Sequence, residues 1–278
     1  ERGDPTDEPR ADSRRSEAAV GRATVPRWNG MPHSPGSNEA KAQVPFDPYP
    51  PDLANCRRCP RLAAFRDEIA RVKRRAYRDQ VYWGAPVPGF GDVDARLLIV
   101  GLAPGAHGSN RTGRMFTGDA SGTFLYASMH RLGLANQPTS VSRSDGLRLT
   151  GAWITASARC VPPDNKPTPA ELGTCMHWLK HDFDGLRNVR AILALGRIGH
   201  DSVLRLYRER GLKATFASVP FAHGAVHRLD ELPGAVEAGA KPLVDAFHVS
   251  LQNTNTGRLT PAMFDEALAV AKSLAGLD

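Results

Sequence analysis

Residues 96–119 read RLLIVGLAPGAHGSNRTGRMFTGD, a short, mostly apolar run followed by a long glycine-rich segment. The run at 96–100 has the length and composition of a buried strand, and the segment after it predicts a loop whose backbone can approach a ligand closely. We expect a helix over 122–134, directly after this loop. Because α/β sheets bind ligands at the carboxyl ends of their strands, this first loop is a candidate functional site.

Three further apolar runs repeat this alternation of strand and helix toward the C-terminus. We expect a helix to begin near Pro169 with Thr168 as its cap. Strands that alternate with helices predict an α/β fold in three layers (α/β/α) around a central, mostly parallel, four-stranded sheet. The other expected strands cover 153–157, 191–195 and 242–250, and the other expected helices cover 196–207 and the residues after Thr260.

The first 45 residues differ in composition from the rest of the chain. They are rich in Arg, Asp, Glu, Ser, Pro and Gly and have few periodic apolar positions. We therefore expect a disordered tail over 1–45 and one folded domain over 46–278. No stretch approaches the roughly 18 consecutive apolar residues of a membrane span, and the N-terminal segment lacks the apolar core of a secretion signal. A monomer in the cytoplasm, without membrane association, is the resulting expectation.

The charge of the chain is compatible with a phosphate-bearing partner. There are 36 Lys and Arg against 29 Asp and Glu, which gives a formal charge of +7. Many basic proteins bind no nucleic acid, however, so charge alone leaves the partner open. Several Arg and Lys residues lie in the segment 62–77, where an ordinary solvated helix face explains them better than phosphate contacts do.

All four cysteines can be assigned to one site. Cys56 and Cys59 form a C-x-x-C motif, and Cys160 and Cys175 flank the segment after the second expected strand. In the cytoplasm the redox poise disfavours disulfides, so a metal site is the better interpretation. Zinc and a 4Fe-4S cluster both accept four cysteines, and spacing does not choose between them. The alternative is that Cys160 and Cys175 are small buried hydrophobic residues.

A second candidate loop follows the last expected strand, where residues 248–258 read HVSLQNTNTGR. His248 stands at its mouth, again at a strand's carboxyl end. A lone histidine is more often a hydrogen-bonded structural residue. In the first loop, Asp119 is a natural N-cap for the following helix, a role compatible with catalysis. For four other histidines we expect the role of a hydrogen-bonded structural residue: His130, His177, His181 and His200.

The two loops, the segment ITASARCVPPDNKP (154–167) and the four cysteines together closely resemble the family 5, or type B, uracil-DNA glycosylases. The resemblance extends from about Asn55 to the C-terminus, and the first loop and the HVSxQNTxTGR pattern are highly specific. It implies a DNA-repair glycosylase that flips uracil and other deaminated bases out of double-stranded DNA and hydrolyses their N-glycosidic bond. It also implies a 4Fe-4S cluster as the cofactor.

The resemblance carries roles onto individual residues. Asp119 is similar to the acidic residue that positions the attacking water, and His248 to the histidine that hydrogen-bonds the departing base. Phe116 matches the aromatic residue that stacks on the extruded base. Base binding is thus expected of Gly105, Ala106, Phe116 and Asn165, entry into the duplex of Leu251, Gln252 and Asn253, and cluster ligation of Cys56, Cys59, Cys160 and Cys175.

Phosphate contacts are expected from arginines in the two loops, with structural salt bridges as the alternative for each: Arg111, Arg114 and Arg258. Ala156 occupies the position where related families place a base-reading asparagine. Without the hydrogen bonds of that asparagine, the pocket discriminates less strictly between bases. We therefore expect it to accept uracil, hypoxanthine, xanthine or etheno-cytosine. The matched motifs place no lysine for Schiff-base chemistry, which predicts base removal without strand cleavage.

Two other classes of function compete with this hypothesis. A non-catalytic iron-sulfur module that only binds DNA would need the charge and the cluster but neither Asp119 nor His248. A zinc-dependent nuclease or deaminase is disfavoured, because the deaminase signature is absent and four cysteines leave no open position on the metal.

Overall fold

A six-stranded sheet runs through residues 46–278, the part of the chain that this computed structural model describes. Its strand order is β1-β3-β2-β4-β6-β5. The four central strands are parallel, as expected: β3 (Ala152–Ala156), β2 (Leu97–Gly101), β4 (Ala191–Leu195) and β6 (Leu243–Ala246). Two antiparallel edge strands were not expected, because two residues carry no recognisable periodicity: β1 (Phe90–Gly91) and β5 (Val226–His227). The expected tail over 1–45 lies outside the described residues.

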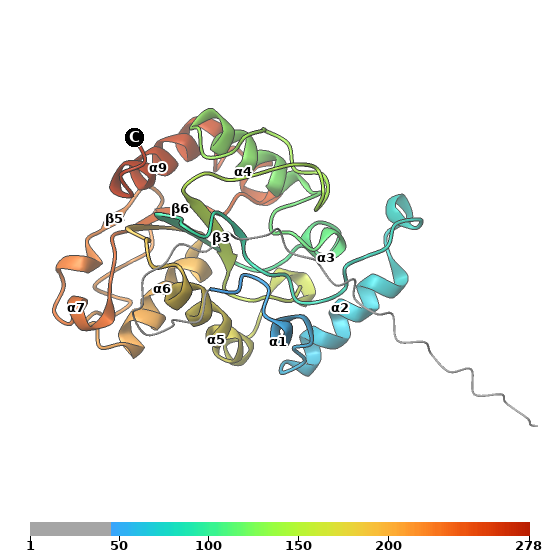
Figure 1. Cartoon of the computed structure of the whole chain (residues 1–278), viewed down its shortest axis with the longest axis horizontal. Coiled ribbons are helices and arrows are strands. Elements are labelled where there is room, and N and C mark those ends of the chain that lie inside the picture. The colour runs from blue at the N-terminus through green and yellow to red at the C-terminus, as the bar shows by residue number, and fades with distance from the viewer. Residues whose placement is uncertain (1–45) are drawn as a thin grey trace, which may run out of the picture. The chain divides into compact units, whose positions relative to one another are not determined.

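Long helices cover both faces of the sheet, which gives the three layers expected (Figure 1). One face is covered by α4 (Ala120–Arg131) and α9 (Pro261–Leu274), and the other by α5 (Pro169–Gly185) and α6 (Arg197–Glu209). The remaining helical elements are α1 (Pro51–Ala54), α2 (Pro60–Val72), η1 (Arg75–Tyr77), α3 (Ser109–Thr112), η2 (Pro163–Asn165), η3 (Leu229–Glu231), α7 (Ala235–Ala238) and α8 (Leu251–Asn255). Within the described chain, no helix combines the length and the apolar character that a membrane crossing requires.

Alternating side chains of the parallel strands build two cores. Leu97 and Ile99 of β2 point toward α4 and α9, whereas Leu98 and Val100 point toward α5 and α6. Every residue of the four central strands is buried. Burial on both faces explains why these strands appear in the sequence as short continuous apolar runs rather than as alternating ones.

Helix caps fix where the long helices begin. Thr168 and Glu171 form a reciprocal capping box at the start of α5, with Pro169 in the first turn, which confirms the predicted cap. Thr260 caps α9 in a similar way through a bond from Met263 N. Asp119 caps α4, so this helix begins at Ala120, two residues earlier than expected. Capping therefore places a carboxylate between the first loop and α4.

The last strand is shorter than expected, and the segment after it is not purely a loop. The strand predicted over 242–250 is wrong in extent, because β6 ends at Ala246. Residues 247–250 then lead into α8, a short helix within the predicted polar loop. Since β2 and β6 run parallel on either side of β4, the first loop and His248 leave the sheet at the same edge.

Candidate functional site

The first loop holds an aromatic side chain against the end of β2. Phe116 is 8% exposed and has a φ of 50°, a left-handed conformation that is strained for a bulky residue. A Cβ built on Gly101 would lie 2.9 Å from Phe116 Cζ, so glycine is needed at the end of β2 for the ring to pack there. A strained residue held this firmly is typical of a functional site.

Asp119 lies against the same loop. Its Oδ1 accepts a hydrogen bond of 3.0 Å from Gly122 N, the capping bond of α4. Its Oδ2 faces the loop: a Cβ on Gly105 would lie 2.9 Å away, and a Cβ on Gly108 would collide with the carboxylate. Burial raises the pKa of Asp119, although the hydrogen bond from Gly122 opposes the shift. The loop glycines thus make room for the carboxylate, whose Oδ2 faces the loop.

His248 borders Phe116 from the other loop. The two ring centroids lie 6.0 Å apart, at an interplanar angle of 36°. Burial lowers the pKa of His248 to about 4, so the imidazole is neutral at pH 7. Asn253 Nδ2 donates a bond of 2.8 Å to His248 O, which ties α8 to the backbone of this histidine. A neutral imidazole offers one N–H donor without bringing a charge into the site.

Two predicted base-binding positions, Gly105 and Ala106, lie partly exposed in the first loop. Asn165 is exposed in η2, with a φ of 56°. Its predicted contact with the base stays a prediction. Ala156 is buried at the end of β3, where it pairs with Gly101 of β2.

Residues predicted to enter the duplex are accessible on α8. Leu251 is 53% exposed, an unusual exposure for a large apolar side chain, and Gln252 beside it is exposed as well. Arg258 is also exposed, and its guanidinium carbon lies 4.5 Å from the centroid of the Phe247 ring. All three side chains can therefore reach a partner without a change of fold.

The predicted phosphate contact of Arg114 is wrong. Its guanidinium is buried and forms two bonds to Asp145, of 2.7 and 2.8 Å. It also donates to the hydroxyls of Thr117 and Ser140. Burial opposes ionisation of Asp145, yet Arg114 and three backbone N–H groups lower the pKa of this carboxyl to about 2. Arg114 is thus a structural residue, the alternative that the sequence left open.

Arg111 is largely buried too, and it braces the first loop. Its guanidinium donates to His107 O at 2.6 Å, to Gln80 Oε1 at 2.6 Å and to Gly118 O at 2.8 Å. A phosphate contact by its remaining N–H groups stays a prediction. Because Gly118 directly precedes Asp119, this arginine connects the catalytic candidate to the segment near Gln80.

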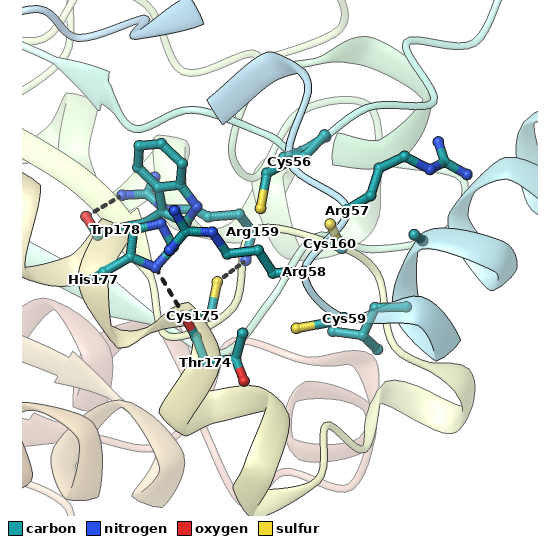
Figure 2. A pocket seen from close by; sticks show the side chains of 13 residues that line it. Cys56, Arg57, Arg58, Cys59, Arg159, Cys160, Thr174, Cys175, His177 and Trp178 are labelled. Atoms are coloured by element: carbon teal, nitrogen blue, oxygen red, sulfur yellow. Dashed lines mark hydrogen bonds between the residues drawn. The ribbon is translucent and has the colours of Figure 1, made fainter. Parts of the chain in front are cut away.

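The four cysteines line one pocket although they come from separate parts of the chain (Figure 2). Cys56 lies between α1 and α2, and Cys59 directly precedes α2. Cys160 follows β3, and Cys175 belongs to α5. Such convergence contradicts the alternative in which Cys160 and Cys175 are merely isolated buried residues.

The spacing of the sulfurs suits a cluster better than a single zinc ion. Tetrahedral zinc, with Zn–S bonds of about 2.3 Å, holds its four sulfurs about 3.8 Å apart. Among the described residues, no three cysteine sulfurs lie within 4.8 Å of one another. A four-iron cluster is larger than one ion and accepts four thiolates at wider spacing.

Unpaired donors around the same pocket also suit an anionic cluster. Arg159 Nε, Arg159 Nη1 and Trp178 Nε1 are buried and have no hydrogen-bond partner in the described structure, and both residues line the pocket. Arg159 N donates to Cys175 Sγ at 3.3 Å, and Arg66 Nη1 to Cys160 Sγ at 3.3 Å. Cluster sulfurs accept such bonds, so these residues fit the group.

Burial favours the thiol form of three of the four cysteines in the absence of a cation. It raises the pKa of Cys59 and Cys160, and that of Cys175 to about 12. Thiolates form here only if a positively charged group compensates the desolvation, which a bound metal does.

One buried polar cluster was missed by sequence reasoning. His200 is a hydrogen-bonded structural histidine, as expected: its Nδ1 lies 2.8 Å from Asp245 Oδ1 and its Nε2 lies 2.9 Å from Val219 O. His227 Nε2 lies 3.0 Å from Asp245 Oδ2. The sequence did contain a sign of this cluster, because Asp245 interrupts the apolar strand β6. The structural role is also confirmed for three other histidines, each bonded to a backbone carbonyl: His130, His177 and His181.

Comparison with known proteins gives one consistent family. Residues 88–272 match the sequence model described as "Uracil DNA glycosylase superfamily". The type-5 uracil-DNA glycosylase of Thermus thermophilus is 51% identical over 225 residues, which cover 81% of this chain and 96% of the relative. That of Pyrobaculum aerophilum is 42% identical over 231 residues, with 83% and 94% covered. A type-4 uracil-DNA glycosylase of the same archaeon is 30% identical over 162 residues, with 58% and 65% covered.

Proposed function

The chain belongs to the uracil-DNA glycosylase superfamily, and we propose that it removes uracil and other deaminated bases from double-stranded DNA by base flipping, without cutting the strand. Besides uracil, the bases that we propose the pocket accepts are hypoxanthine, xanthine and etheno-cytosine. We further propose that it acts as a monomer in the cytoplasm.

One observation carries the proposal: Phe116, Asp119 and His248 border one glycine-lined edge of the sheet. An aromatic face, a carboxylate oxygen and a neutral imidazole are what hydrolysis of an N-glycosidic bond requires. Positive charge builds on the sugar as the bond breaks, while negative charge builds on the base. The three side chains provide stacking, water activation and hydrogen bonding, respectively.

Asp119 is the residue that would hold the attacking water. Its Oδ1 accepts the capping bond from Gly122, and its Oδ2, which faces the loop, would accept a proton from water. A fixed carboxylate lowers the entropic cost of bringing water to the sugar carbon. The carboxylate also stabilises the positive charge that develops on the sugar.

His248 would donate a hydrogen bond to a carbonyl of the departing base. Because burial keeps this imidazole neutral, the bond strengthens only as negative charge develops on the base, which favours the transition state over the bound substrate. Phe116 would stack on the base.

α8 would enter the duplex in place of the flipped nucleotide. Extrusion of a base costs a few kcal/mol, and least for a mispaired base. Leu251 is exposed at the start of α8 and can occupy the vacated stack. Asn253 fixes the helix to His248, so insertion of α8 and placement of the histidine would be coupled.

We also propose that the four cysteines hold a 4Fe-4S cluster, whose contribution is a structural cross-link rather than a reacting group. Through Cys56, Cys59, Cys160 and Cys175 it would join the start of α2 to the segment after β3 and to α5. Anaerobically purified protein is expected to contain about four iron atoms and four sulfides per chain. Zinc in place of iron would refute this assignment.

The glycosylase proposal is tested with labelled duplexes that carry one uracil, one hypoxanthine or only normal bases. Strand breaks at the lesion are expected only after hot alkali. Asp119→Asn should lower the single-turnover rate at least about 100-fold, because it removes the general base. Asparagine is also a good N-cap, so the thermal midpoint should stay near that of the wild type. His248→Phe should lower the rate as well.

Asp184→Asn is the matched control for the loss of a carboxylate, since Asp184 is an exposed residue of α5. Its rate should equal that of the wild type. If lesion duplexes remain intact after alkali while the protein binds them, the chain is a non-catalytic binding module. Breaks that form without alkali would refute the absence of strand cleavage.

A further inference from the structure

An open pocket with several hydrogen-bond donors lies next to the first loop, apart from the proposed base site. We name it the Arg143 pocket. Three separate segments form it, namely the residues around 80, α3 and the residues around 142. Its lining consists of Gln80, Val81, Arg111, Thr112, Val141, Ser142 and Arg143. Two of these residues are arginines and none is acidic, which favours an anionic ligand.

Arg143 has no ion-pair partner among the residues that the structure describes. Its guanidinium carbon lies 4.5 Å from the centroid of the Trp83 ring and 5.4 Å from that of Tyr49. Stacking on aromatic rings orients a guanidinium and leaves its N–H groups, which point along its plane, available to an oxyanion. Trp83 packs closely on Gly113 at the end of α3, so the platform under Arg143 is itself fixed.

Other donors complete the pocket. Gln80 accepts from Arg111 through Oε1, which leaves its side-chain amide N–H groups free to donate. The hydroxyl of Ser142 forms no hydrogen bond within the described part of the chain. Arg111 uses three N–H groups to brace the loop and keeps two. The pocket therefore offers charged and neutral donors to the same ligand.

Hydrogen bonds connect this pocket to Gly118, the residue before the proposed catalytic Asp119. Arg111 donates to Gly118 O, and Gly118 N donates to Ser140 O at 2.9 Å. Gly118 precedes Asp119, so a ligand in the pocket would lie beside the nucleotide whose glycosidic bond is attacked by the water that Asp119 holds. At the rim, Val81 and Val141 are 92% and 62% exposed. Apolar rim residues beside an anion site suit a ligand in which sugars alternate with phosphates.

We propose that the Arg143 pocket binds a phosphodiester group of the DNA strand beside the flipped nucleotide. This assignment rests on the proposed glycosylase function. The contact by Arg143 takes the place of the phosphate contact predicted for Arg114, because the guanidinium of Arg114 is bonded to Asp145. Arg143 acts as a positioning residue, because it contacts the backbone of the substrate and not the reacting atoms.

The test measures binding of a fluorescein-labelled duplex with a stable tetrahydrofuran abasic analogue, by anisotropy over a range of salt concentrations. Each lost phosphate contact lowers the slope of log K against log salt by about 0.9. Arg143→Ala should show that decrease and bind on the order of tenfold more weakly. Arg143→Lys should keep the wild-type slope, since it keeps the charge.

Arg187→Ala is the matched control, because this exposed arginine lies between α5 and β4, at the opposite end of the sheet. Its slope and affinity should equal those of the wild type. An Arg143→Ala variant with the wild-type slope would overturn the phosphate site, even if its thermal midpoint fell. Uracil excision by the wild type, assayed in parallel, separates the two proposals: its absence refutes the glycosylase function, whatever the slopes show.

Discussion

Two histidines next to strand β6 have pKa values that are shifted in opposite directions. His248 follows the strand and has no charged group that offsets its burial, so its pKa falls to about 4. His200 packs against Asp245 in the middle of the strand. Burial also opposes its charge, but the hydrogen bond and the charge of Asp245 outweigh this effect and raise its pKa. A single carboxylate thus accounts for the opposite directions of the two pKa shifts.

The hydrogen bonds of His200 agree with the cationic form. A backbone carbonyl can only accept, so Nε2 must donate to Val219 O, and the carboxylate of Asp245 accepts from Nδ1. Protonation of both ring nitrogens would satisfy both bonds, which agrees with the raised pKa of His200. His248 is left to act as a neutral donor in the proposed site, while His200 serves as a cross-link between α6, β6 and the segment near Val219.

Removal of the Asp245 carboxylate should have the largest effect on the difference between the two histidines. Asp245→Asn leaves His200 buried without its counter-charge, and we expect the free energy of unfolding to fall by about 3 kcal/mol. Equilibrium denaturation at pH 6 measures the change. Asp184→Asn, which breaks an exposed ion pair with Arg210, should cost less than about 1 kcal/mol. A loss of similar size in both variants would contradict the buried ion pair.

Acid should expose the difference between the two histidines. The unfolded chain protonates His248 as the pH falls through 6.5, whereas the folded protein stays neutral until about 4. Stability from this group is therefore present above pH 6.5 and is lost as the pH falls. His200 has a raised pKa and contributes below pH 6.5, so its contribution is lost only as the pH rises through its folded pKa.

Between pH 7 and pH 5, the wild type should lose about 2 kcal/mol more stability than His248→Asn. Denaturation curves of both proteins at the two pH values give the difference directly. Groups common to both chains cancel in this comparison. Equal losses would show that His248 titrates at its ordinary pKa and that the site does not keep it neutral.

The sequence predicted the parts of the fold that depend on local patterns. Apolar runs gave the four parallel strands, and Thr168 and Thr260 gave the helix starts, because strand burial and capping are visible within a few residues. The shortening of the last strand at Ala246 was not predicted. Its apolar pattern continues past that residue, but pairing with β4 stops there.

The candidate site was predicted only where the sequence motif itself places the residues. Phe116, Asp119 and His248 lie in two loops whose meeting follows from parallel strands. The partners of charged residues were not predictable, because Arg114 and Asp145 are 31 positions apart and His200 and Asp245 are 45 apart. Which arginine is buried in an ion pair and which is left for a ligand, as with Arg114 and Arg143, depends on such long-range contacts.

The smallest effect should come from the outer histidine of the cluster. His227→Phe keeps a ring at a position that is 14% exposed but removes the donor to Asp245 Oδ2. That oxygen still accepts from Ala222 N at 3.3 Å, so the carboxylate is not left unpaired, and a loss of about 1 kcal/mol is expected. If thermal denaturation shows a loss as large as that of Asp245→Asn, the bond from His227 rather than the bond from His200 accounts for most of the stability that Asp245 contributes.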